Sequence, residues 1–137
     1  MGQPESGTNR HERTRQDHAS ETAEDYVEAI AELIDTNGQC RLTNLAGRFA
    51  VSHVTANKTI ARLQKEGLVA TEPYGPIELT DLGRQLATAA RRRHEIVLRF
   101  LIALGVSENT AATDAEGIEH HVSEETLQAM SRYTNRS

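Results

Sequence analysis

The stretch LTNLAGRFAVSHVTANKTIARL, residues 42–63, decides the fold of this 137-residue chain. Its apolar residues recur at helical spacing in two sets, and Ala50 and Val51 separate the sets. The sets are Leu42, Leu45, Ala46 and Phe49, followed by Ala56, Ile60 and Leu63. Each set predicts an amphipathic helix, and Ser52 is placed to cap the second one. Two helices joined by so short a turn indicate a helix-turn-helix.

The outer face of the second helix has the composition of a DNA-reading surface. Its apolar residues face inward, which leaves short polar side chains and cations outward near the helix N-terminus. We predict DNA contacts from Arg48, Ser52, His53, Val54, Thr55, Asn57, Lys58 and Arg62. The three cations are expected to meet phosphates, and the other five residues to approach base edges. The alternative is an ordinary short helical hairpin that does not bind DNA.

A β-hairpin is predicted directly after this helix. Residues 68–72 and 77–80 read as two short strands that flank the turn Pro73-Tyr74-Gly75-Pro76. Two helices followed by such a hairpin make a winged helix. Tyr74 at the tip of the wing either touches a sugar-phosphate backbone or packs on the hairpin.

The N-terminal part of the chain is predicted to be a tail followed by an acidic helix. Residues 1–19 hold almost no hydrophobic residue, so we predict a disordered tail. A helix is expected to begin at Ser20 or Thr22 and to end at Asn37-Gly38. Residues 21–35 contain six acids and no Lys or Arg. We therefore assign residues 20–81 to a winged helix-turn-helix domain with an acidic first helix.

Residues 82–137 are predicted to form a second, helical domain. A long helix runs to about Leu104, and a final helix begins at Ser123. The long helix has a broad apolar stripe of Leu82, Leu86, Ala89, Val97, Phe100, Leu101 and Leu104. Between the two helices, the sequence Asp114-Ala-Glu-Gly-Ile-Glu-His-His121 carries an apolar stripe. Glu116, Glu119 and His120 fall in one narrow arc beside that stripe. Two carboxylates and an imidazole so arranged can chelate a divalent cation, although a solvated acidic face is the alternative.

Charge is divided along the chain, and this matters more than the net charge of −5. Cations dominate residues 41–67 and 84–99, which suits an anionic partner. Within the second zone, Arg91, Arg92 and Arg93 are read as a solvated face, with phosphate contact as the alternative. The single cysteine, Cys40, excludes an internal disulfide and is expected to be half-buried. No apolar run suits a membrane span or a signal peptide, which predicts a cytoplasmic protein with no membrane partner.

Several of these motifs together resemble a known family. They are Asp25-Tyr-Val-Glu28, the winged helix, Arg93-His-Glu95 and Asp114-Ala-Glu-Gly-Ile-Glu-His-His-Val-Ser123. The pattern is similar to the manganese-transport-regulator branch of the diphtheria-toxin-repressor family, over roughly residues 20–133. This resemblance implies a homodimeric, metal-dependent repressor of metal-uptake genes that binds a palindromic operator in double-stranded DNA, and it implies no enzymatic activity.

The resemblance also implies a ligand set. The family's metal-binding positions correspond to Asp25, Glu28, His94, Glu116, Glu119 and His120. Four carboxylates and two imidazoles suit Mn²⁺, with up to two ions per subunit, and Fe²⁺, Co²⁺, Cd²⁺ or Zn²⁺ as substitutes.

Two alternative functions remain at this point. One is a winged-helix regulator that responds to iron or to a small organic ligand. If the signal is an organic ligand, the acidic clusters are only surface residues. The other is a carboxylate-bridged di-metal enzyme, which requires four long helices with inward Glu and Glu-x-x-His pairs. The second is disfavoured because residues 42–80 are committed to the winged helix.

Overall fold

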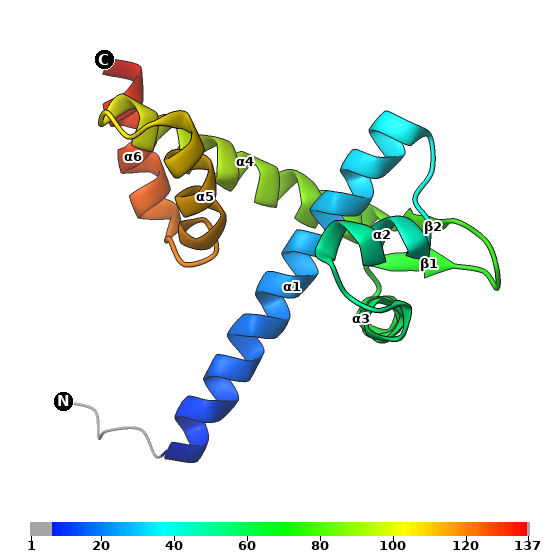
Figure 1. Ribbon diagram of the computed structural model, residues 1–137. Coiled ribbons are helices and arrows are strands. Elements are labelled where there is room, and N and C mark those ends of the chain that lie inside the picture. Colours follow the sequence, from blue (N-terminus) through cyan, green and yellow to red (C-terminus); the bar gives the residue numbers. More distant parts are fainter. Residues whose placement is uncertain (1–6, 137) are drawn as a thin grey trace. The chain divides into compact units, whose positions relative to one another are not determined.

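The computed structural model describes residues 7–136, which form mostly helices (Figure 1). In order, the elements are α1 (Gly7–Asn37), α2 (Leu42–Phe49), α3 (His53–Lys65), β1 (Val69–Thr71), β2 (Ile77–Leu79), α4 (Asp81–Ala103), α5 (Glu108–Ile118) and α6 (Glu124–Arg136). The chain divides into two compact units between Leu86 and Ala87, within α4. A winged helix-turn-helix followed by a helical unit confirms the predicted fold class. None of the helices in the described residues is long and apolar enough to cross a membrane.

The predicted start of the first helix was wrong. α1 begins at Gly7, so residues 7–19 of the expected disordered tail are helical, and residues 1–6 lie outside the described part. The prediction considered only that these residues cannot bury apolar surface. A helix that extends an already packed one avoids the cost of nucleation, and Arg, Glu and Gln propagate helices well.

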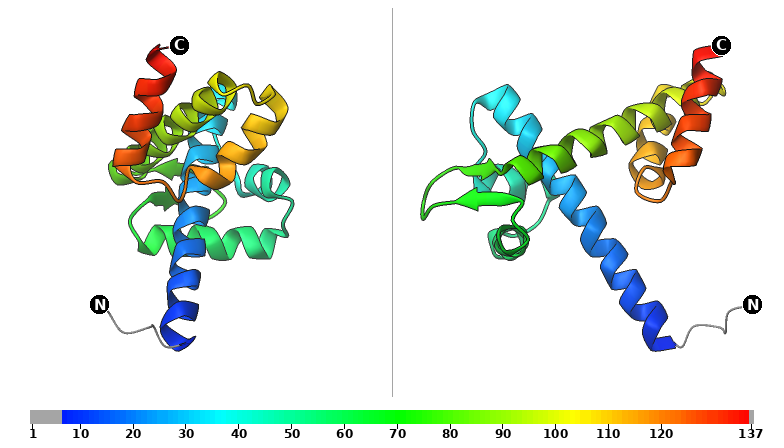
Figure 2. Two further views of the ribbon diagram at one scale, coloured as in Figure 1. Left: turned by 90° about the vertical axis from the view of Figure 1, so that its left-hand side faces the viewer. Right: turned by 180° about the vertical axis from the view of Figure 1, so that it is seen from behind.

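The first unit is built around the apolar side of α1. Tyr26, Val27 and Ile30 are buried there, and α1 contacts both α2 and β2. The Tyr26 ring stacks on Phe49 of α2 with 4.2 Å between ring centroids and 3° between planes. α3 contacts α2 on one side and β1 on the other (Figure 2). The acidic helix therefore forms the base on which the helix-turn-helix is packed.

The helix-turn-helix follows the sequence prediction closely. Ala50 adopts a left-handed conformation with φ of 53° and ends α2. Ser52 then caps α3, because its hydroxyl oxygen accepts a bond from the Thr55 N–H at 3.1 Å. Inside the unit, α3 buries the residues that the apolar spacing predicted, Ala56, Ile60 and Leu63. The outward face of α3 is thereby fixed as well.

The wing is a two-stranded antiparallel hairpin in which Val69 pairs with Leu79 and Thr71 with Ile77. Tyr74 at its tip is fully exposed and has a φ of 61°, so it does not pack on the hairpin. Cys40 is fully buried beneath β2, where its carbonyl accepts a bond from the Ile77 N–H at 2.7 Å, so the half-buried position was wrong. Burial raises the pKa of the Cys40 thiol to about 11, which keeps it neutral and unreactive at pH 7.

The first turn of α4 is joined to the hairpin by close backbone contact. The Thr80 hydroxyl oxygen accepts a bond from the Gly83 N–H at 3.0 Å, and Gly83 is buried against Leu68. Leu82, expected in the apolar stripe, is 54% exposed instead. Only a residue without a side chain can approach the Leu68 carbonyl so closely, and this rotates the start of the stripe by one residue.

The second unit has a small core between three helices. Val97 of α4, Ala115 of α5 and Leu127 of α6 form its buried centre. Phe100 and Tyr133 meet edge to face beside it, with centroids 5.5 Å apart. This core fixes how α5 and α6 lie against the second half of α4.

We expect Gly83→Ala to destabilise the protein by about 1–3 kcal/mol, because the added methyl group would overlap the Leu68 carbonyl oxygen. Gly47→Ala is the matched control, since nothing lies within 4 Å of that position and its φ is not left-handed. It should stabilise α2 by about 0.5–1 kcal/mol. Urea unfolding followed by circular dichroism measures both; equal stabilities for the two variants would contradict the packing described.

Candidate metal centre and DNA-binding surface

The candidate metal centre in the second unit is organised around a buried carboxylate. Glu119 is only 3% exposed, in a unit whose other acids lie mostly at the surface. Nδ1 of His94, on α4, lies 3.1 Å from Oε2 of Glu119. Nε2 of His120 lies 3.7 Å from Oε1 of the same carboxylate. Three of the predicted ligand residues are thus brought together by two segments of chain.

The end of α5 positions these residues. The helix ends at Ile118, and Glu119 keeps helical backbone angles as its C-cap, with its N–H bonded to the Ala115 carbonyl at 2.9 Å. His120 already lies in the turn beyond the helix. The single helical arc predicted for Glu116, Glu119 and His120 was therefore wrong for His120, because the helical geometry stops before it.

The other three predicted ligands are Glu116 in the second unit and Asp25 and Glu28 in the first unit. Glu116 is exposed on α5 and has no ion pair with another described residue. Asp25 and Glu28 lie one turn apart on α1, in the first unit. Their membership of the site stays a prediction.

The buried cluster fits a divalent cation. A buried carboxylate is costly unless positive charge or hydrogen bonds compensate it, and two imidazoles alone supply little charge when neutral. The clustered donors are oxygen and nitrogen, and the one thiol of the chain is buried in the first unit. Such donors suit Mn²⁺, Fe²⁺ or Zn²⁺ better than a soft ion such as Cu⁺.

In the run of three arginines before His94, Arg91 and Arg92 are exposed, as expected of a solvated face, whereas Arg93 is half-buried. All three also have partners within the second unit. Arg91 pairs with Glu95 on its own helix at 3.5 Å. Arg92 forms two hydrogen bonds with Glu124 and lowers the pKa of that carboxyl. Arg93 donates from Nε to the main-chain carbonyl of Glu119 at 3.1 Å. Sequence reasoning missed this last contact; the only signal was the position of Arg93 beside a ligand.

The outer face of α3 is exposed as predicted. All five residues assigned to base edges are exposed, as is Lys58; the five are Ser52, His53, Val54, Thr55 and Asn57. Val54 is 66% exposed, so this face also carries an apolar side chain. The Ser52 hydroxyl is occupied with the cap of α3. This face can therefore present donors, acceptors and a methyl surface to DNA.

A groove of about 850 Å³ lies between α3 and the wing. His53, Val54 and Asn57 line its helical side, and Thr71 and Tyr74 line its wing side. Arg41 also lines it and donates from Nη1 to the Tyr74 carbonyl at 3.2 Å. The sequence analysis left Tyr74 open between backbone contact and packing on the hairpin, and it did not assign Arg41 to this surface. Arg41 was missed because only the folded hairpin brings it close to α3.

Two of the predicted phosphate-binding cations are already engaged inside the first unit. Arg48 pairs with Glu32 of α1. Arg62 donates from Nη2 to the Ala19 carbonyl at 3.2 Å, and its Nε lies 3.7 Å from Glu66. Lys58, which is exposed, is therefore the most available of the three predicted cations for a phosphate.

Comparison with known proteins identifies both halves of the chain. Residues 18–77 match the profile described as "Iron dependent repressor, N-terminal DNA binding domain". Residues 80–136 match "Iron dependent repressor, metal binding and dimerisation domain". The chain belongs to the iron-dependent repressor family. It is thus a DNA-binding transcriptional regulator with a metal-binding and dimerisation domain, and the resemblance to the diphtheria-toxin-repressor family is confirmed.

Individual repressors of this family are similar over most of the chain. The transcriptional regulator MntR of Escherichia coli O6:H1 is 45% identical over 122 residues, which cover 89% of this chain and 79% of that protein. A manganese-dependent transcriptional repressor solved in complex with manganese is 32% identical, with a TM-score of 0.75, and the match covers 84% of this chain and 53% of that one. ScaR with bound Zn²⁺ is 25% identical, with a TM-score of 0.70, and the match covers 84% and 54%. The chain thus spans about half the length of these two solved structures.

We expect Lys58→Ala to weaken DNA binding by a similar factor for every DNA sequence, because a phosphate contact does not depend on the bases. If Lys58 neutralises one phosphate, the slope of log binding constant against log salt concentration should become smaller in magnitude by about one unit. Fluorescence anisotropy with a labelled duplex at several salt concentrations measures this. Arg99→Ala, an exposed cation of the second unit, is the control and should leave the slope unchanged. Unchanged slope and affinity in Lys58→Ala would mean that α3 does not meet the backbone there.

Proposed function

We propose that this chain is a manganese-responsive repressor of metal-uptake genes, with Mn²⁺ as co-repressor. The observation that carries the proposal is the buried Glu119 carboxylate between His94 and His120, in a unit of the metal-binding type. The related manganese-dependent repressor, solved with manganese, supports the choice of metal. The absence of sulfur from the clustered donors supports it further.

We assign six ligands to the site: Asp25, Glu28, His94, Glu116, Glu119 and His120. Three are clustered, and Glu116 lies one turn before Glu119 on α5. Asp25 and Glu28 share one side of α1, in a stretch without cations. A bound divalent cation supplies the positive charge that offsets the repulsion among these carboxylates. Their number allows one or two ions per subunit.

Ligands drawn from both units explain how metal would control DNA binding. If the acids of α1 and those of the second unit share one site, as we propose, they would repel one another without a bound cation. Metal binding favours arrangements in which both sets of acids contribute ligands, and it shifts the population toward them by its differential affinity. A 10- to 100-fold gain in DNA affinity requires a coupling of only about 1.4–2.8 kcal/mol.

The DNA side of the proposal follows from the winged helix and the dimerisation domain. A homodimer presents two α3 helices, so its operator is expected to be palindromic. His53, Val54, Thr55 and Asn57 would approach base edges, and Lys58 would meet phosphate. A chromosomal operator places the protein in the cytoplasm. A regulator controlled by iron or by an organic ligand is the competing function.

We expect Glu119→Gln to weaken Mn²⁺ binding by at least tenfold, since a buried charged ligand becomes neutral, and Glu116→Gln to weaken it as well. Isothermal titration calorimetry with Mn²⁺ measures this, and circular dichroism checks the fold. Glu108→Gln, at the exposed first turn of α5, is the matched control and should bind as the parent does.

Two results would contradict the assignment. Wild-type protein that binds no Mn²⁺, yet binds DNA equally with and without it, would exclude a manganese co-repressor. Full affinity in both Glu119→Gln and Glu116→Gln would leave the metal response intact but place the site elsewhere.

Zn²⁺ should bind at least as tightly as Mn²⁺ and activate DNA binding less. Affinity at a fixed site generally rises from Mn²⁺ toward Cu²⁺, so affinity alone cannot select manganese. Zn²⁺ prefers four ligands in a tetrahedron, and it would therefore leave part of the six-residue set unused. A palindromic duplex is first selected from a random pool with Mn²⁺ present. The affinity of the protein for this duplex is then measured at saturating concentrations of each metal. Equal activation by both metals would refute this account of selectivity.

A further inference from the structure

Arg92 and Arg93 hold both ends of the segment that carries Glu119 and His120. Arg93 donates from Nε to the Glu119 carbonyl at 3.1 Å, where α5 ends. Arg92 donates from Nη2 and Nη1 to the two carboxylate oxygens of Glu124, at 2.8 and 3.1 Å, where α6 begins. Only residues 120–123 lie between these two fixed points.

The next residue of α4 reaches the same segment. His94 lies 3.1 Å from the Glu119 carboxylate through Nδ1. Glu119 is therefore contacted twice from adjacent residues of α4, at its main-chain carbonyl by Arg93 and at its side chain by His94. Fixing both the backbone and the carboxylate leaves the side chain little freedom to turn away.

The Arg93 contact has a specific physical effect on the end of α5. The last carbonyls of a helix lack partners within the helix and carry partial negative charge. A guanidinium that donates to the C-cap carbonyl satisfies one of them by a charge-assisted bond, which is stronger than a neutral one. It thereby sets the point at which the chain leaves the helix and turns toward His120.

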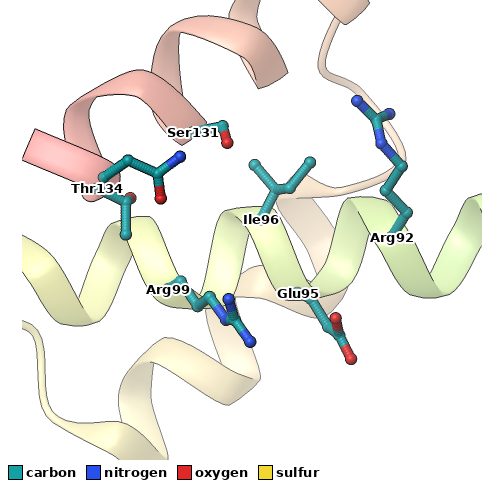
Figure 3. A pocket seen from close by; sticks show the side chains of 7 residues that line it. Arg92, Glu95, Ile96, Arg99, Ser131 and Thr134 are labelled. Atoms are coloured by element: carbon teal, nitrogen blue, oxygen red, sulfur yellow. The ribbon is translucent and has the colours of Figure 1, made fainter.

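The Arg92 contact secures the other end. Its two parallel bonds to Glu124 fix direction as well as distance, and Glu124 sits in the first turn of α6, where an acid is favourable. The stem of Arg92 also lines a cavity of about 160 Å³ between α4 and α6, beside Ile96 and Ser131 (Figure 3). Both groups are half exposed, so this pair contributes less than the Arg93 bond.

We infer that Arg93, with Arg92 in support, is a positioning residue that preorganises Glu119 and His120 for the metal. The inference rests on the proposed metal site. The competing reading of these cations is direct contact with DNA phosphates. The two readings differ in what excess metal can repair: a positioning role is restored by saturating Mn²⁺, whereas a lost phosphate contact is not.

The experiment compares Arg91→Gln, Arg92→Gln, Arg93→Gln and Arg93→Lys in the full chain. Mn²⁺ affinity is measured by calorimetry, DNA affinity by anisotropy at limiting and saturating Mn²⁺, and metal-free stability by thermal melting. Arg91, which pairs with Glu95 on its own helix, is the matched control.

Arg93→Gln should lose roughly 10- to 100-fold in Mn²⁺ affinity, the usual effect of losing a group that orients a ligand. Arg92→Gln should lose about two- to fivefold in Mn²⁺ affinity. Arg93→Lys keeps a charged donor and should therefore lose less Mn²⁺ affinity than Arg93→Gln. DNA affinity at saturating Mn²⁺ and its salt slope should equal those of wild type in all variants. If Arg93→Gln does not fold, the charge exchange Arg92→Glu with Glu124→Arg should recover the Mn²⁺ affinity that Arg92→Glu alone loses.

Three results would overturn the inference. The first is a folded Arg93→Gln variant that binds Mn²⁺ with wild-type affinity. The second is a smaller salt dependence of DNA binding by Arg93→Gln or Arg92→Gln at saturating Mn²⁺. The third is a charge-exchange variant that does not recover the Mn²⁺ affinity lost by Arg92→Glu. None of these can be confused with failure of the proposed function, in which the wild-type protein itself does not bind Mn²⁺.

Discussion

The second unit depends on the burial of one carboxylate. Removing the charge of Glu119 from water costs several kcal/mol unless nearby groups compensate it. The surroundings are built to do so: α4 supplies His94 to the side chain and Arg93 to the backbone, and the turn after α5 supplies His120. The apolar core of Val97, Ala115 and Leu127 holds these elements at the required separation. A divalent cation bound there, as we propose, would complete the compensation that imidazoles alone provide only in part.

The first unit meets a different requirement, which is to present one helix face to a partner. Buried residues of α3 fix its inner side, and the stacked rings of Tyr26 and Phe49 fix α2 against α1. Because Gly83 allows α4 to touch the hairpin, the wing is tied to the start of the long helix. Arg48 and Arg62, which we predict to meet phosphates, also join α2 and α3 to α1. Part of the basic charge therefore supports the fold of the DNA-reading surface.

Much of the fold could be predicted because its signals are local. α2, the Ser52 cap, α3 and the start of α6 depend on spacing and capping within a few residues. The prediction was wrong where a more distant part of the chain decides: residues 7–19 extend a helix packed farther along, and Leu82 is exposed because Gly83 packs on Leu68. Cys40 is buried where its backbone pairs with Ile77 of β2, which is distant in the sequence. In each case the deciding contact joins residues that no local pattern relates.

The sequence by itself determined the winged helix, the helical second domain and the types of donor available for a metal. Those depend on composition and periodicity, which are properties of short stretches. Only the tertiary structure decided which of these donors are buried together and what holds them. Three successive arginines look alike in the sequence, yet Arg91 stays on its own helix, Arg92 reaches α6 and Arg93 reaches the end of α5. Their partners differ because residues on a helix point about 100° apart, and the packing of α5 and α6 determines what each direction meets.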